Sequence, residues 1–114
     1  LMLWDNKSKE SVYTFPKNHA EQFKRYIRNS AKRVNVFLVI VPSVDESAEK
    51  MAKQLKNDND TDSDVAIITA KELKHVAENW QKFSKSGTFN LKVFNDTGIL
   101  ERKDLEENMK MCLS

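Results

Sequence analysis

The stretch VNVFLVIV at residues 34–41 constrains the fold of this chain more than any other part of the sequence. It is almost entirely apolar and rich in β-branched residues, which is typical of a strand buried on both faces of a sheet. Pro42 follows directly and ends the strand, because proline cannot donate the next hydrogen bond of a ladder. Two shorter apolar runs, at residues 1–4 and 65–68, predict further buried strands.

Amphipathic segments follow these strands and predict helices. Apolar residues recur there at helical spacing, and in three places an Asn, Ser or Thr stands three residues before a Glu, which is the pattern of a capping box. The boxes are Asn18 with Glu21, Ser43 with Glu46, and Thr69 with Glu72. The predicted helices cover residues 18–31, 43–56, 69–83 and 101–111. The residues predicted to face the core are Ala48, Met51, Ala52 and Leu55 in the helix at 43–56, and Leu105 and Met109 in the helix at 101–111. Residues 89–94 fit a strand or a short helix, and residues 95–98 fit a turn.

Strands that alternate with helices predict an α/β protein with a mixed or largely parallel sheet and helices on both faces. The 114 residues suffice for one domain. No apolar run approaches the ~18 residues that a membrane span needs, and no signal peptide pattern is present. The single cysteine, Cys112, cannot form an internal disulfide. These features predict one cytoplasmic domain that does not enter a membrane.

The net charge of +2 does not by itself predict nucleic-acid binding, but the charges are unevenly distributed. Six Lys or Arg residues and one acid, Glu21, lie between residues 17 and 33, whereas residues 58–64 contain four Asp and no base. A basic helix and an acidic loop predict a polarised surface. Solvated charges on an ordinary helix explain the same pattern.

Asp5-Asn6-Lys7 is the strongest candidate for chemistry. Side chains two residues apart on a strand point to the same side, so Asp5 and Lys7 are predicted to lie together where the first strand ends. Phosphodiester hydrolysis needs a hard cation held by carboxylates and a positive group against the charge on the phosphate. This spacing supplies both, although it also occurs by chance in many proteins. A glycine-rich phosphate loop, zinc spacing of Cys and His, and a serine hydrolase elbow are absent from the sequence.

The residues around this triplet resemble the catalytic region of the PD-(D/E)xK nucleases, and more closely the FokI-type cleavage domain of type IIS restriction endonucleases. The matching positions, which align without gaps, are Asp5-x-Lys7, Tyr13-x-x-Pro16, Ala20 and Arg25-Tyr26. Weaker similarity continues through the strands at 36–41 and 65–68 to Glu72-Leu73 and Gly87-Thr88. The resemblance covers most of the chain, but only the first quarter contains specific motifs.

The resemblance implies a three-layer restriction-endonuclease-like core and Mg²⁺-dependent cleavage of double-stranded DNA. It makes Asp5 a metal ligand, the Asn6 backbone carbonyl another, and Lys7 the catalytic lysine. Glu21 and Arg25 match an Asp and an Arg that pair across the family's dimer interface, so the helix at 18–31 is predicted to form a homodimer. Their spacing also allows an ion pair within the helix. Candidate contacts to the DNA are Lys9, Lys17, His19, Lys24 and Arg28.

One feature of the family is missing from this sequence. The family's first metal-binding Asp lies on a strand before the D-x-K strand, whereas Asp5 here follows only four residues. We expect the chain to be the later part of a cleavage domain that lacks its upstream segment, and to cut DNA weakly or not at all by itself. The alternative is a non-catalytic α/β interaction or regulatory module. In that case Asp5 and Lys7 form a structural ion pair, and the basic helix binds a partner.

Overall fold

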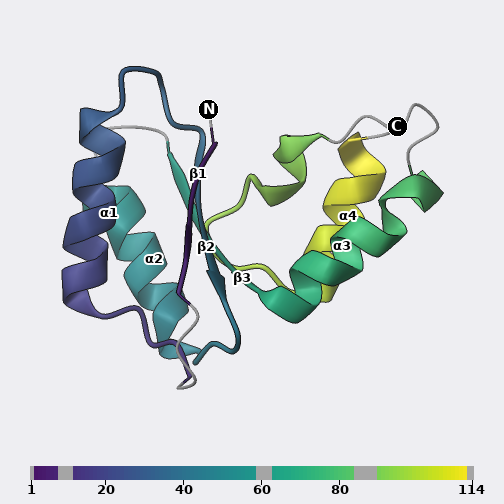
Figure 1. The fold of residues 1–114 in the computed structure, drawn as a ribbon, viewed down its shortest axis with the longest axis horizontal. Coiled ribbons are helices and arrows are strands. Elements are labelled where there is room, and N and C mark those ends of the chain that lie inside the picture. The colour runs from purple at the N-terminus through teal and green to yellow at the C-terminus, as the bar shows by residue number, and fades with distance from the viewer. Residues whose placement is uncertain (1, 8–11, 59–62, 84–89, 113–114) are drawn as a thin grey trace.

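A computed structural model of the chain describes residues 2–7, 12–58, 63–83 and 90–112. The strands are β1 (Met2–Asn6), β2 (Val36–Val41), β3 (Asp64–Thr69) and β4 (Gly98–Ile99). The helices are α1 (Lys17–Asn29), α2 (Ser47–Asp58), α3 (Ala70–Phe83) and α4 (Arg102–Cys112), with a short 3₁₀ helix, η1 (Leu91–Phe94), before β4. Strands and helices alternate along the chain, so the predicted α/β class is confirmed (Figure 1).

The four strands form one sheet in the order β1-β2-β3-β4, and each pair of neighbours is parallel. Of the two predicted alternatives, the largely parallel sheet is confirmed and the mixed sheet is wrong for the described strands. The reason is that a helix lies in each connection between consecutive strands and returns the chain to the end of the sheet where the previous strand began. β2 lies between β1 and β3, and five of its six residues are buried, as its apolar sequence predicts.

Helices pack on both faces of the sheet (Figure 1). On one face, Phe23 of α1 and Leu55 of α2 share a core cluster with Phe37 and Val39 of β2. The cluster on the opposite face joins β2 and β3 to α3, η1 and α4 through Leu38, Ile68, Val76, Phe94 and Leu105. The predicted flanking by helices is confirmed. The restriction-endonuclease-like identity of the arrangement stays a prediction.

The third crossover connection has the opposite hand to the first two. The strands follow one another across the sheet in sequence order, and α1 and α2 both cross the face that carries Phe37 and Val39. α3 crosses the other face, although the chain continues in the same direction to β4. Because right-handed crossovers predominate in proteins, this strand order alone would place all three helices on one face.

The predicted capping boxes are half correct at one helix and wrong at two. Thr69 Oγ1 accepts a hydrogen bond from Glu72 N at 3.3 Å, which confirms the cap at the start of α3, whereas the Glu72 carboxylate accepts from Arg102 and does not close the box. α1 begins at Lys17 rather than Asn18, and no side chain caps it. Pro16 precedes the helix, and its carbonyl accepts two N–H groups of the first turn. The pre-set φ of proline therefore makes a side-chain cap unnecessary here.

α2 begins at Ser47, later than the sequence predicts. Val44 forms an isolated parallel bridge with Tyr13, which keeps the chain extended where a helix start at Ser43 is predicted. The Asp45 carboxylate then accepts hydrogen bonds from the Ser47 hydroxyl and from Ser47 N, the latter at 3.0 Å. Both bonds lower the pKa of Asp45, and the bond from the hydroxyl has the larger effect. Asp45 is thus the residue that starts α2.

β4 is the described element that the sequence does not predict. Gly98 and Ile99 pair with β3 where the sequence indicates only a turn. Gly98 has a φ of +110°, a conformation that favours glycine. η1 confirms the short helix among the two alternatives for residues 89–94. In α4, Leu105 and Met109 are buried as predicted.

Candidate functional site

Asp5 and Lys7 lie together at the carboxyl end of β1. Asp5 pairs with Val39 in the sheet, and because side chains alternate along a strand, Asp5 and Lys7 share the face that α1 covers. Lys7 Nζ lies 2.9 Å from Asp5 Oδ2, and the Lys7 and Asp5 side chains are 21% and 28% exposed. The prediction that the two side chains point the same way is confirmed. A carboxylate and an ammonium are therefore accessible together at the end of a strand.

Two residues of α1 complete the surroundings of the Lys7 ammonium. Lys7 Nζ donates a hydrogen bond to Gln22 Oε1 at 3.4 Å, and it lies 5.6 Å from the centre of the Phe23 ring. Gln22 Nε2 in turn donates to the Tyr26 hydroxyl at 2.9 Å. The contact between Gln22 and Lys7 is not predictable from local patterns, because it joins two elements. The i, i+4 spacing of Gln22 and Tyr26 is its only local signal.

The Asn6 backbone carbonyl points away from β2. Lys7 N donates to Ile40 O at 2.9 Å. Because the C=O and N–H of one trans peptide point in opposite directions, the Asn6 carbonyl faces the other edge of β1. β1 is the first strand of the described sheet, and among the described strands none pairs with that edge. The Asn6 carbonyl therefore takes no part in the hydrogen bonds between β1 and β2.

Asp5 and the Asn6 carbonyl offer hard oxygen ligands, which Mg²⁺ prefers. Within the described ranges, no group of three or more His, Cys, Asp or Glu side chains is placed to hold a metal ion. Mg²⁺ nevertheless often keeps several waters and takes one or two carboxylates together with phosphate oxygens. The two oxygen ligands fit this sparse mode of binding, in which water and substrate supply most of the coordination.

Tyr13, on the segment before α1, and His19, in the first turn of α1, lie close to these residues. The Tyr13 hydroxyl lies 3.0 Å from His19 Nδ1, and the two rings stack with their centroids 5.6 Å apart. Burial, and to a lesser extent the negative charge of Asp5, raise the pKa of Tyr13. The phenol therefore stays neutral well into the alkaline range. The pairing with His19 is not predicted from the sequence, which indicates only that His19 stands near a helix start.

Most of the other predicted DNA contacts lie along α1. Lys17 and Lys24 line a hollow of about 150 Å³ between α1 and α2, together with Glu21. Arg28 is exposed in the last turn of α1. Lys9 lies outside the described residues. The structure thus has three of the predicted cations on one helix, with Lys17 and Lys24 on the side toward α2 and Gln22 on the side toward Lys7.

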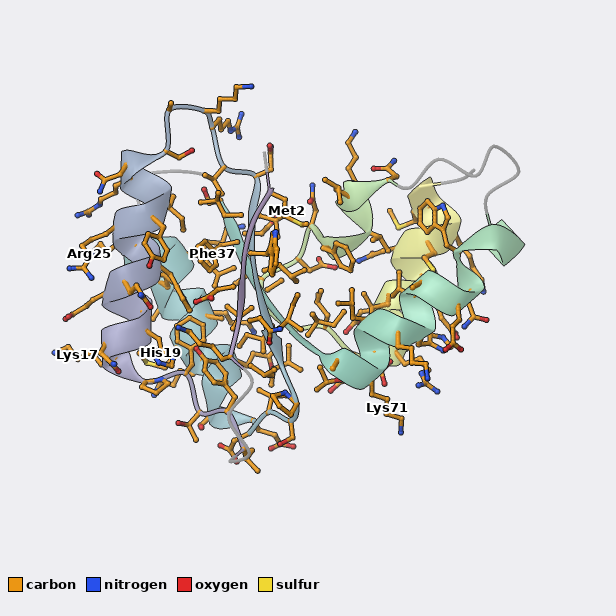
Figure 2. The ribbon with its side chains drawn as sticks, in the orientation of Figure 1. Met2, Lys17, His19, Arg25, Phe37 and Lys71 are labelled. Carbon is orange, nitrogen blue, oxygen red and sulfur yellow. The ribbon has the colours of Figure 1, made fainter. Side chains whose placement is uncertain are left out.

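The two predicted dimer residues, Glu21 and Arg25, are exposed on α1. Figure 2 shows Arg25 on the side of α1 that faces away from the sheet. In the part of the chain that the structure describes, no ion pair joins Glu21 to Arg25. The ion pair within the helix that their spacing allows is therefore not formed. Both side chains are accessible to a partner.

Comparison of the chain with protein-family models, with curated proteins and with solved structures gives no match. Among the residues that the structure describes, no helix is long and apolar enough to cross a membrane. The support for a function therefore comes from the geometry of the site itself.

Proposed function

We propose that Asp5, Asn6 and Lys7 form the catalytic centre of a Mg²⁺-dependent nuclease that hydrolyses double-stranded DNA, of the type IIS restriction endonuclease class. The observation that carries this proposal is the 2.9 Å approach of the Lys7 ammonium to the Asp5 carboxylate at the end of a core strand. Both charges lie beside α1, which contains four Lys or Arg residues and one acid. A hard anionic ligand, a cation and a basic helix are together suited to bind and cleave a polyanion.

Each of these groups has a separate role in the proposed reaction. Asp5 and the Asn6 carbonyl hold the ion, which when bound supplies the Lewis acid that polarises the phosphate and activates water. The Lys7 ammonium stabilises the negative charge that develops on the phosphate oxygens. The basic side chains of α1 and the imidazole of His19 contact flanking backbone phosphates and so fix the position of the duplex.

A second copy of the chain is part of this proposal. Glu21 of one copy pairs with Arg25 of the other across a two-fold axis on the outer side of α1, so each pair occurs twice in the interface. Two copies then present one D-x-K site to each strand of the duplex. The exposure of both side chains and the absence of an ion pair between them within the described helix support this arrangement.

Mn²⁺ tests the metal site directly, because it prefers the same oxygen ligands as Mg²⁺ and broadens the NMR signals of nearby nuclei. We expect Mn²⁺ to broaden the amide signals of residues 5–7 first, and Asp5→Asn to abolish this selectivity. Glu107→Gln, an acid exposed on α4, is the matched control and keeps it. Broadening that is the same in the wild type and in Asp5→Asn contradicts a metal site at Asp5.

Cleavage of a DNA duplex, measured as kcat and KM, tests the chemistry. We expect any Mg²⁺-dependent cleavage to fall about a hundredfold or more in Asp5→Asn and in Lys7→Ala, because each change removes a group that stabilises the transition state. Lys74→Ala, on the exposed surface of α3, is the control for a lost positive charge. Cleavage that persists unchanged in both site variants excludes the catalytic assignment.

A non-catalytic interaction module is the second candidate. The Lys7 ammonium already has partners in Asp5 and Gln22, so the pair can serve the fold alone. Among the described residues, Asp5 also belongs to no group of three or more metal-binding side chains. Under this alternative, Asp5→Asn and Lys7→Ala lower the free energy of unfolding but change neither Mn²⁺ binding nor DNA cleavage.

A further inference from the structure

The Lys7 ammonium is held between Asp5 on its own strand and side chains of α1. Nζ contacts Asp5 Oδ2 on its own strand at 2.9 Å and Gln22 Oε1 on the helix at 3.4 Å. The Phe23 ring lies beside it, with its centre 5.6 Å from Nζ. A lysine side chain is a flexible four-carbon stem that places its charge only where other groups hold it. Asp5 and the contacts from α1 therefore hold the charge of Lys7 in place together.

Tyr26 holds the far end of the Gln22 amide. Gln22 Nε2 donates to the Tyr26 hydroxyl at 2.9 Å, and the amide oxygen lies toward the ammonium. In the reversed orientation the amide would turn N–H donors toward a cation that has only donors itself. The Tyr26 ring is held against Phe37, with the centroids 6.3 Å apart and the planes 14° from parallel. A chain of contacts thus runs from the core to Lys7.

We propose that Gln22 is a positioning residue for Lys7, and that the Tyr26 hydroxyl holds the Gln22 amide in place. Asp5 and Gln22 each accept one N–H of the ammonium, which leaves the third for a phosphate oxygen. The positioning is a property of the folded chain, while its effect on catalysis rests on the proposed function. An ammonium that is already in place needs little reorganisation when charge develops on the phosphate.

NMR of the 114-residue chain with ¹³C-labelled lysine tests the positioning. In Gln22→Ala, we expect the order parameter of the Lys7 ε-carbon to fall toward that of the exposed Lys74. Tyr26→Phe removes only the hydroxyl and is expected to give a smaller fall. Gln22→Glu is expected to restore the wild-type value, because a carboxylate oxygen also accepts from the ammonium. Gln54→Ala, the same change at an exposed position of α2, is the matched control.

An order parameter of Lys7 that is unchanged in Gln22→Ala overturns the proposal, and so does a loss that Gln22→Glu fails to restore. Tyr26 is 47% exposed, so Tyr26→Phe tests the chain of contacts with little effect on the core. In the cleavage assay, Gln22→Ala is expected to lower kcat about tenfold without changing KM for DNA, because Gln22 acts through Lys7. An unchanged kcat refutes the catalytic part.

Failure of this inference and failure of the proposed function are distinguishable. If Mn²⁺ does not bind at Asp5, the nuclease proposal fails, while the order parameter of Lys7 still decides whether Gln22 positions it. If Asp5→Asn abolishes metal binding and cleavage but Gln22→Ala changes neither kcat nor the order parameter, the nuclease proposal stands and the positioning role is refuted.

Discussion

The Tyr13 hydroxyl lies 3.0 Å from His19 Nδ1, and this contact joins the segment before α1 to the first turn of the helix. Tyr13 N donates to Ser43 O at 2.9 Å, and Asp45 N donates to Tyr13 O at 2.8 Å. The residue therefore connects α1 to the chain that follows β2. Because its ring is only 7% exposed, ionisation of the phenol inside the fold is unfavourable.

Tyr13→Phe tests the consequence for stability in alkaline solution. The pKa of Tyr13 is raised above its ordinary value of 10.0, so above that pH the unfolded chain loses the proton first. The contribution of the neutral phenol to the free energy of unfolding is fully present below about pH 10, and it is lost as the pH rises toward the folded-state pKa. We expect the free energy of unfolding to fall more steeply with pH in the wild type than in Tyr13→Phe. At neutral pH, the lost hydrogen bond costs about 1 kcal/mol.

Urea unfolding between about pH 8 and pH 11 measures this difference. Tyr26→Phe, at an exposed tyrosine, is the control for the loss of one phenol. Parallel pH profiles for the wild type and Tyr13→Phe show that Tyr13 ionises equally easily in both states, which contradicts the prediction.

Asp45→Asn tests the start of α2 in acid. Hydrogen bonds from Ser47 lower the pKa of Asp45 below its ordinary value of 3.8, so the charged form favours the folded state. That stabilisation is present above about pH 4 and is lost as the pH falls through the lower folded-state pKa. We expect the wild type to lose more stability between pH 5 and pH 2 than Asp45→Asn loses. Glu46→Gln changes the neighbouring exposed acid, and an equal effect there shows that Asp45 is not special.

Periodic patterns in the sequence predict the features of this fold that depend on one element at a time. The common direction of Asp5 and Lys7 needs only the two-residue repeat of a strand, and it is confirmed. The burial of Ala48, Ala52 and Leu55 needs only the helical repeat of α2, and it is confirmed as well. The placement of Asp5 and Lys7 in the candidate site therefore follows from local rules.

Features that depend on contacts between elements are not predictable in this way. Ser43 has the sequence of a helix cap, but the bridge between Tyr13 and Val44 keeps that segment extended. Gln22 contacts Lys7 only because α1 packs over the end of β1. The two-residue strand β4 has no hydrophobic pattern of its own, since its pairing with β3 follows from the path of α3 across the second face.

Gly98→Ala tests the connection between β4 and α2. The φ of +110° is strained for any residue with a Cβ, and a Cβ built there lies 2.5 Å from Glu49 Oε1. The carboxylate can rotate away, so most of the expected loss of about 1–3 kcal/mol in the free energy of unfolding is backbone strain. Chemical unfolding of Gly98→Ala, Glu49→Ala and the double variant separates the two effects. Full recovery in the double variant shows instead that the clash dominates.

The salt dependence of DNA binding tests the role of the basic residues on α1. Each phosphate contact contributes about one unit to the slope of log affinity against log salt concentration. We expect Lys17→Ala and Arg28→Ala each to reduce that slope by about one, measured by fluorescence anisotropy with a labelled duplex and without divalent metal. Lys74→Ala removes an exposed charge on the other face of the sheet and is expected to leave the slope unchanged. Equal slopes in all proteins place the DNA elsewhere.

A charge exchange tests the proposed dimer through Glu21 and Arg25. Glu21→Arg places two like charges opposite each other in the interface, and Arg25→Glu does the same with the opposite sign, so each variant is expected to remain monomeric at concentrations where the wild type dimerises. An equimolar mixture of the two variants restores opposite charges in both pairs and is expected to form heterodimers. Sedimentation velocity at low ionic strength measures the oligomeric state of the two variants and of their mixture.

Lys50→Glu, an exposed charge reversal on α2, is the control. If the mixture stays monomeric while the wild type dimerises, the two residues lie in the interface without pairing. If neither variant changes the oligomeric state, α1 is not the interface.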